Sequence, residues 1–266
     1  NVSSQYISGL LFALPLLEED SEIRITTELQ SEDYVKMTLD TLKAFSISVV
    51  YEKNCFYIPG KQVYTIKDGL GVEGDWSNAA FFMTGAAIGQ TQITYTNLNE
   101  ASLQGDKAVV DILKNMGTNI ERCEDAYTVS GSKMTAVDIH AKAIPDLVPI
   151  LALAASVSEG VTIISGAERL RIKESDRLKT VYETLSTLGA DIEEKEDGLI
   201  IRGKAKLKGG VVSSHNDHRI AMMSAIASLV CEEDVIILQA EAVNKSYPGF
   251  YEDFEKLGGK VKIDKE

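Results

Sequence analysis

Four segments of this chain repeat one design at a spacing of 71 residues. Positions 4, 75, 146 and 217 differ by 71 each time, and each begins a polar head that precedes a run of small and apolar residues. The four segments are "SSQYISGLLFAL" from Ser3, "GDWSNAAFFMTGAAI" from Gly74, "PDLVPILALAASV" from Pro145 and "DHRIAMMSAIASL" from Asp217. A repeat of this length predicts a fold built from similar supersecondary units.

Each apolar helix is followed by an amphipathic one, and short β-rich runs separate the helices. The second helices are expected in "EDYVKMTLDTLKAF", "LQGDKAVVDILKNMG", "ESDRLKTVYETLSTLG" and "GFYEDFEKLGG". Gly117, Gly189 and Gly258 stand at their ends, where a left-handed cap favours glycine. Strands are expected in "EIRITTE", "QITYTN", "VTIIS" and "VIILQ", and in the pairs "ISVVYE" with "CFYIPG" and "ADIEEKE" with "GLIIRG". Each unit therefore reads β-α-β-α-β-β.

The first helix of each unit is apolar almost all round, whereas the second keeps a charged face. This contrast predicts a mixed α/β (α+β) fold with buried helices and outer sheets. If rotation relates the units, the polar heads point the same way, and helix N-termini there attract anions. Asp75, Asp146 and Asp217 are then either plain N-caps or parts of a site, and the repeat leaves both interpretations open.

The stretch "RLRIKESDRL" from Arg169 places four cations and two carboxylates in ten residues. On one helix Lys173 and Arg177 would share a face, where like charges are unfavourable, and cations in a first turn oppose the helix dipole. A bound anion would offset both effects. The alternative is a solvated helix face on which Glu174 and Arg177 form an ion pair, and the stretch alone favours that alternative.

Composition narrows the classes of partner. With 266 residues, 44% of them hydrophobic, the chain is expected to be globular with two domains. A net charge of -13 argues against nucleic acid or an anionic membrane. The three cysteines lack CxxC spacing and the three histidines lack HExxH spacing, so neither a disulfide framework nor a catalytic metal is expected. Without a signal peptide or an apolar run of spanning length, a cytoplasmic location is expected.

Two motifs, "KESDRL" from Lys173 and "NDHRIAM" from Asn216, resemble signatures of the 5-enolpyruvylshikimate-3-phosphate (EPSP) synthase family. "SSQY", "VEGDWSNAAFF", "IPD", "LGA" and "NKSYPGF" follow in that family's order, so the resemblance covers essentially the whole chain. It implies an enolpyruvyl transferase fold of six βαβαββ units, three in each inside-out α/β barrel (prism) domain. Residues 1–72 look like the last unit of an incomplete first domain, and residues 73–266 look like the second domain of three units.

The resemblance also implies an enzymatic activity. The family transfers the enolpyruvyl group of phosphoenolpyruvate to the 5-hydroxyl of shikimate 3-phosphate and releases phosphate, a step of the shikimate pathway to chorismate and the aromatic amino acids. No cofactor or metal is implied. The expected partners are these two small molecules, and the full-length protein is expected to be monomeric.

Site residues carry over motif by motif. The implied catalytic residues are Asp146, Glu174, His218 and Lys245. The residues implied at shikimate 3-phosphate are Ser3, Ser4, Gln5, Ser31, Tyr34, Asp146 and Lys173. The residues implied at phosphoenolpyruvate are Gln5, Arg177, Arg219 and Lys245.

Part of the family's pattern lies upstream of Asn1, namely a lysine, a glycine-rich loop and an arginine at the substrates. The chain also opens without Met. We therefore expect little turnover from these 266 residues alone and a need for the N-terminal part. Two alternatives remain: an enzyme like the enolpyruvyl transferase that acts on UDP-N-acetylglucosamine, or a non-catalytic anion-binding protein of the same fold. In a non-catalytic binding protein Asp146→Asn would have no chemical consequence, whereas in an enzyme it would lower the reaction rate.

Overall fold

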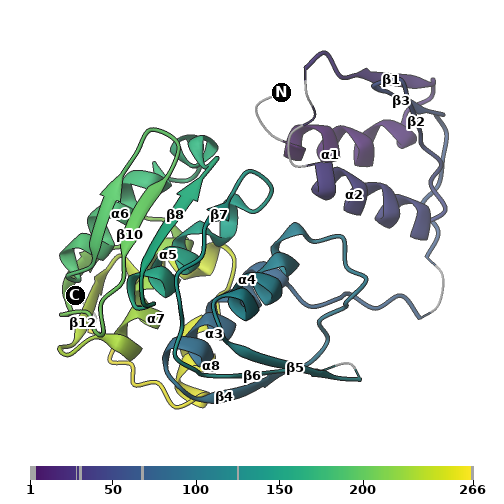
Figure 1. The fold of residues 1–266 in the computed structure, drawn as a ribbon. Coiled ribbons are helices and arrows are strands. Elements are labelled where there is room, and N and C mark those ends of the chain that lie inside the picture. Colours follow the sequence, from purple (N-terminus) through teal and green to yellow (C-terminus); the bar gives the residue numbers. More distant parts are fainter. Residues whose placement is uncertain (1–3, 28, 30–31, 67–68, 125, 265–266) are drawn as a thin grey trace. The chain divides into compact units, whose positions relative to one another are not determined.

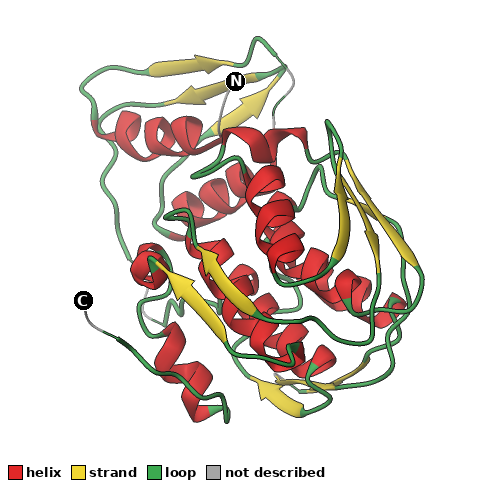
Figure 2. Ribbon diagram, turned by 90° about the vertical axis from the view of Figure 1, so that its left-hand side faces the viewer, coloured by secondary structure: helices red, strands yellow, loops and turns green. Residues whose placement is uncertain are grey.

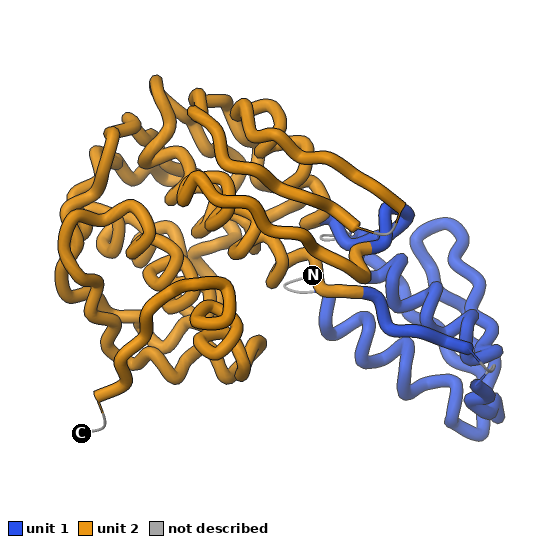
Figure 3. Tube along the Cα trace, turned by 90° about the horizontal axis from the view of Figure 1, so that it is seen from below, with its two compact units in different colours: residues 1–73, 99–105 blue, residues 74–98, 106–266 orange. Residues whose placement is uncertain are grey.

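A computed structural model describes residues 4–27, 29, 32–66, 69–124 and 126–264. The chain divides into two compact units, drawn in different colours in Figure 3. The smaller unit holds residues 1–73 and 99–105, and the larger unit holds residues 74–98 and 106–266. Residues 99–105 contact the smaller unit through the side chains of Ser102 and Gln104, which donate hydrogen bonds of 2.7 and 2.8 Å to Glu73 Oε1.

The smaller unit is one three-stranded antiparallel sheet with two helices (Figure 1). The sheet order is β1-β3-β2, with Ser21 opposite Ile58 and Val50 opposite Tyr57. The elements are α1 (Ser4–Ala13), β1 (Ser21–Arg24), α2 (Glu32–Ala44), β2 (Val50–Glu52) and β3 (Cys55–Ile58), with a short 3-10 helix at Leu14–Leu16. One small core of Ile, Leu, Val and Phe side chains joins the helices to the sheet.

The first helix of the smaller unit is not buried, so that prediction is wrong for α1. Ile7 and Leu11 face the core, but Tyr6 is 70% exposed, and Leu10 and Phe12 are also exposed. The reason is that this unit supplies apolar partners to one side of α1 only, from α2 and the sheet. An apolar face of the smaller unit therefore stays in contact with solvent.

The larger unit contains six α-helices and nine strands among the described residues. The helices are α3 (Trp76–Ile88), α4 (Val109–Asn115), α5 (Val148–Ser156), α6 (Arg177–Thr187), α7 (His218–Ala227) and α8 (Phe250–Lys256). The strands are β4 (Gln92–Tyr95), β5 (Asn119–Cys123), β6 (Ala126–Ser130), β7 (Ile139–His140), β8 (Val161–Ser165), β9 (Asp191–Glu194), β10 (Leu199–Arg202), β11 (Gly210–Ser213) and β12 (Val235–Leu238).

These strands form three separate sheets. Their orders are β4-β6-β5, β7-β8-β10-β9 and β11-β12. The pairs β7 with β8 and β11 with β12 are parallel, and the remaining pairs are antiparallel. The complete β-α-β-α-β-β unit is present once, as β7-α5-β8-α6-β9-β10, and the other units show fewer strands in the described part of the chain.

Helices α3, α5 and α7 are buried and pack against one another, as the sequence predicted. Figure 2 shows helices in red in the interior of the larger unit and strands in yellow toward its outside. The expected cap glycines are also confirmed, because Gly117, Gly189 and Gly258 have φ of +99°, +93° and +100°. None of the helices described is both long and apolar enough to cross a membrane. The larger unit is thus a bundle of buried helices whose N-terminal ends gather polar side chains.

Candidate anion-binding site

The three aspartates of the repeat have different roles in the structure. Asp75 caps α3 by accepting from Asn78 N at 3.0 Å, and Asp217 caps α7 by accepting from Arg219 N at 2.9 Å. Asp146 lies in a 3-10 turn, Pro145–Leu147, and α5 starts without a side-chain cap. Its carboxylate is therefore left for other partners, which are cations.

Arg177 is the centre of these contacts. Its side chain is only 1% exposed and bonds three carboxylates: Nη1 to Asp146 Oδ1 at 2.7 Å, Nη2 to Glu174 Oε2 at 2.5 Å, and Nε to Asp217 Oδ2 at 2.8 Å. Burial alone would lower the pKa of this guanidinium, but the surrounding carboxylates raise it. Because Asp146 precedes α5 and Asp217 precedes α7, the shared arginine shows that both helices begin at one place, as predicted.

Helix α6 begins at Arg177, so the expectation that Lys173 and Arg177 share a helix face is wrong. Lys173 follows a 3-10 helix at Glu168–Ile172, and residues 173–176 have no regular structure. Asp176 ends that irregular segment by capping α6, accepting from Lys179 N at 3.2 Å. The alternative of a solvated helix face is also wrong, because Arg177 is buried. The ion pair between Glu174 and Arg177 that this alternative predicted does form.

Asp146 collects three cations. Lys173 Nζ lies 3.4 Å from Oδ1, Arg219 Nη2 lies 3.4 Å from Oδ2, and Arg177 donates to Oδ1. Burial opposes ionisation of this carboxyl, but Arg219, Lys173 and Arg177 together hold its pKa well below its usual range. The side chain keeps 15% of its surface exposed. It is thus an ionised acceptor that a ligand hydroxyl can still reach.

For Asp217 the sequence left open whether it is a plain N-cap or part of a site, and in the structure it does both. Its side chain is fully buried, and besides Arg177 it accepts from Ser175 Oγ at 2.9 Å. Although burial works in the opposite direction, Arg177 and the backbone of Arg219 lower the pKa of Asp217. The signal that pointed to it was its 71-residue spacing from Asp146. The set of Asp146, Lys173, Glu174, Arg177, Asp217 and Arg219 is called the ion cluster below.

His218 and Lys245 lie next to the ion cluster. His218 is the buried first residue of α7, and burial, with Arg219 and Arg177, lowers its pKa, so the ring is neutral at pH 7. Its Nδ1 is 3.9 Å from Asp217 Oδ1, too far for a hydrogen bond. Lys245 ends a 3-10 helix, Ala240–Lys245, and donates to Asn216 O at 2.5 Å.

Two buried nitrogens of this region, Arg219 Nε and His218 Nδ1, have no hydrogen-bond partner among the described residues. Buried polar groups are normally paired, and an unpaired one at a cationic site indicates a position for a ligand. An anionic ligand group would give Arg219 Nε the acceptor that it lacks.

Several residues predicted at the substrates belong to the smaller unit, whereas the ion cluster belongs to the larger unit. Ser4 is the buried first residue of α1, Gln5 follows it with an exposed side chain, and Tyr34 lies half-buried in α2. Ser3 and Ser31 fall outside the described residues. No group of three His, Cys, Asp or Glu side chains that could hold a metal occurs in the described ranges.

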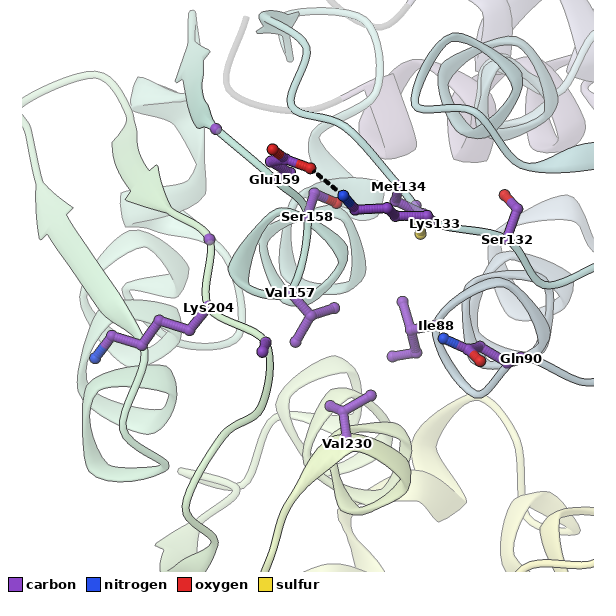
Figure 4. Close-up of a pocket in the computed structure, with 13 residues that line it drawn as sticks. Ile88, Gln90, Ser132, Lys133, Met134, Val157, Ser158, Glu159, Lys204 and Val230 are labelled. Carbon is purple, nitrogen blue, oxygen red and sulfur yellow. Dashed lines mark ion pairs between the residues drawn. The ribbon is translucent and has the colours of Figure 1, made fainter.

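A cavity of about 450 Å³ opens at the other ends of the core helices (Figure 4). Ile88 and Val157, at the C-terminal ends of α3 and α5, and Val230 form its apolar floor. Its charged side chains already have partners within the protein. Lys133 pairs with Glu159 at 2.5 Å, and Lys204 Nζ donates a hydrogen bond to Gly189 O at 2.8 Å. Since no lining residue in the described part carries an unpaired buried polar atom, the ion cluster is the better candidate site.

Comparison with known proteins gives a consistent result. Residues 1–254 match the family model of EPSP synthase (3-phosphoshikimate 1-carboxyvinyltransferase). The 3-phosphoshikimate 1-carboxyvinyltransferase of Clostridium novyi (strain NT) is 54% identical over 262 residues, and that of Clostridium kluyveri is 52% identical over 264 residues. These matches cover 97% and 98% of this chain but 59% and 61% of the relatives.

Solved structures agree with the sequence matches. An EPSP synthase structure from Acinetobacter baumannii superposes with a TM-score of 0.84 at 30% identity, covering 99% of this chain and 62% of that one. A second structure from the same organism gives a TM-score of 0.80 at 28% identity. The chain thus spans about three fifths of the length of the relatives it matches.

Proposed function

Because the chain belongs to the EPSP synthase (3-phosphoshikimate 1-carboxyvinyltransferase) family, we propose that in its complete natural reading frame it transfers the enolpyruvyl group of phosphoenolpyruvate to the 5-hydroxyl of shikimate 3-phosphate. Phosphate is the second product. The reaction requires no cofactor, and we propose a cytoplasmic monomer. Residues 1–72 and 73–266 would contribute to the two domains that hold the substrates.

One structural observation supports this proposal most directly. Arg219 Nε is a buried donor without a partner, next to an ionised acceptor, Asp146, and a further cation, Lys173. Such a site offers donors for an anionic group and an acceptor for a hydroxyl at neighbouring positions. Shikimate 3-phosphate carries both kinds of group, and phosphoenolpyruvate carries a carboxylate and a phosphate.

The roles follow from the chemistry of addition and elimination. The 5-hydroxyl oxygen bonds to C2 of phosphoenolpyruvate, its proton passes to a base, and an acid protonates C3 to give a tetrahedral ketal phosphate. Loss of a C3 proton and departure of phosphate then restore the vinyl group. We assign Asp146 to the hydroxyl and Glu174 to the C3 proton. The cations Lys173, Arg177, Arg219 and Lys245 stabilise the substrate phosphates and the carboxylate, with neutral His218 beside them.

Substrate binding would change the basicity of Asp146. In the structure three cations hold the pKa of Asp146 low, and so weakly basic a carboxylate is a poor proton acceptor. When anionic substrate groups bind Lys173 and Arg219, the field of those cations at Asp146 is partly neutralised, and the pKa of Asp146 rises toward its ordinary value. This coupling would make Asp146 an effective base only in the loaded site.

The existing contacts of Arg177 limit how it takes part in binding. Its three nitrogens are already bonded to Asp146, Glu174 and Asp217. Direct binding of phosphoenolpyruvate by Arg177 therefore requires that Glu174 or Asp146 releases it. Glu174 is the more accessible of these two partners, with 42% of its side chain exposed, and its movement toward the substrate would free Arg177 Nη2.

The test is Asp146→Asn in the complete reading frame. Asparagine keeps the shape and can still bond the hydroxyl, but it cannot accept the proton, so kcat should fall by roughly 10²–10⁴-fold while calorimetric binding of shikimate 3-phosphate weakens modestly. The matched control is Asp75→Asn, which keeps the cap of α3 and should leave kcat within about twofold of the parent. An unchanged rate in Asp146→Asn would remove this residue from the chemistry.

A further inference from the structure

The segment that carries Lys173 and Glu174 lacks regular structure of its own. Residues 173–176 join the 3-10 helix Glu168–Ile172 to α6 without a helical or strand hydrogen-bond pattern. Yet the charged ends of Lys173 and Glu174 meet Asp146 and Arg177 at 3.4 and 2.5 Å. Such contacts require that side chains from outside the segment fix its backbone.

Arg171, two residues before the segment, makes that connection. Its Nη1 donates to Asp176 Oδ2 at 3.1 Å and to Glu194 Oε1 at 2.7 Å. Its Nε donates to Glu196 O at 2.9 Å, and its Nη2 donates to Lys195 O at 2.7 Å. All three nitrogens are used, and the guanidinium joins the end of the segment to the turn between β9 and β10.

The opposite side of the segment is fixed by the ion cluster. Ser175 Oγ donates to the buried carboxylate of Asp217 at 2.9 Å, and Asp176 caps α6 through Lys179 N. Arg171 thus holds Asp176 from the sheet side while Asp217 holds Ser175 from the helix side. Resting on the function proposed above, we propose that Arg171 is a positioning residue, which fixes Lys173 and Glu174 for the reaction without touching a substrate.

The geometry requires an arginine in this place. The guanidinium presents its donors in a planar fork, and here they point to two carboxylates and two carbonyl oxygens. A lysine would keep the positive charge but concentrate its donors on one nitrogen. The Arg171 side chain is also 31% exposed. Its ion pairs therefore contribute little to the free energy of unfolding of the unit, and their main effect is to order residues 173–176.

The experiment compares Arg171→Gln, Arg171→Lys and a matched control in the complete reading frame. The control is Arg202→Gln on β10 of the same sheet, where Arg202 pairs, among the described residues, with the exposed side chains of Asp191 and Glu193. Amide hydrogen exchange is followed at Lys179 and Thr180, whose amides donate to Asp176, and at α5, and kcat and KM are measured for both substrates. Both Arg171 variants should exchange faster at Lys179 and Thr180 but not at α5, and kcat/KM should fall roughly 10- to 100-fold, whereas Arg202→Gln should match the parent.

The outcomes separate positioning from general stability. Unchanged exchange at Lys179 and Thr180 overturns the proposal, and so does faster exchange with unchanged kcat/KM. Full rescue by Arg171→Lys also overturns it, because charge alone would then suffice. A lower yield of folded enzyme with parental KM would indicate a merely structural role. If the parent itself releases no phosphate with shikimate 3-phosphate, the proposed function fails, and exchange at Lys179 and Thr180 then decides alone whether Arg171 fixes the segment.

Discussion

Removal of the Arg177 charge should destabilise the larger unit strongly. In Arg177→Met the stem of the side chain is retained, but Asp217 keeps a fully buried carboxylate with only Ser175 Oγ and the Arg219 amide as donors. Breaking a buried ion pair by removing one partner costs about 3–5 kcal/mol. The free energy of unfolding should fall by that amount at pH 7.

A double-mutant cycle isolates the electrostatic origin of this loss. Asp217→Asn removes the second charge and keeps the cap of α7, because asparagine caps as well as aspartate. The double variant should recover roughly 2–3 kcal/mol of the loss in Arg177→Met. The deficit of the single variant should also shrink as the pH falls toward 4, since protonation removes the uncompensated charge of Asp217.

The assay is urea unfolding followed by tryptophan fluorescence. Trp76 is the only tryptophan of the chain, fully buried at the start of α3, with its ring 5.2 Å from that of Tyr127. Its emission therefore reports on the larger unit, whatever the smaller unit does. A loss below about 1 kcal/mol in Arg177→Met, or an additive cycle, would refute the view that Arg177 holds the ion cluster together.

Three further predictions concern other parts of the chain. Burial raises the pKa of Asp106 to about 6, so stability is highest below the unfolded pKa of this carboxyl and is lost as the pH rises through 6. Asp106→Asn should therefore stabilise the larger unit by roughly 2–3 kcal/mol at pH 8 and by little at pH 4. Equal gains at the two pH values would contradict this pKa assignment. The exposed apolar face of α1 should make the 266-residue chain bind a fluorescent hydrophobic dye. The double variant Tyr6→Ser, Leu10→Ser should reduce the dye fluorescence, and an unchanged fluorescence would mean that the dye binds elsewhere. The 266-residue chain alone should show little or no turnover beside the complete reading frame, which a comparable rate would disprove.

Local patterns predicted much of the fold. The apolar runs from Trp76, Val148 and His218 became buried helices because their composition leaves no polar face to solvate. The same pattern failed for α1, since burial also needs neighbouring elements, and the smaller unit covers one side only. Composition indicates which helices are able to be buried, whereas packing partners decide which of them are buried.

The site was predicted in part. The cations of "KESDRL" do meet around carboxylates, but the partners of Arg177 stand 31 and 40 positions away along the chain at Asp146 and Asp217. Sequence spacing does not encode such distances. The start of α6 was missed for a related reason: Asp176 caps the helix while Arg171 holds it from the neighbouring hairpin, and that contact is also tertiary.

The central claim is best tested by phosphate release from phosphoenolpyruvate, using protein from the complete natural reading frame. Three reactions run in parallel, with shikimate 3-phosphate, with UDP-N-acetylglucosamine and without an acceptor. We predict stoichiometric phosphate release with shikimate 3-phosphate only. Release with the nucleotide sugar would identify a different enolpyruvyl transferase, and no release in any of the three would contradict the enzymatic function and leave an anion-binding protein of this fold.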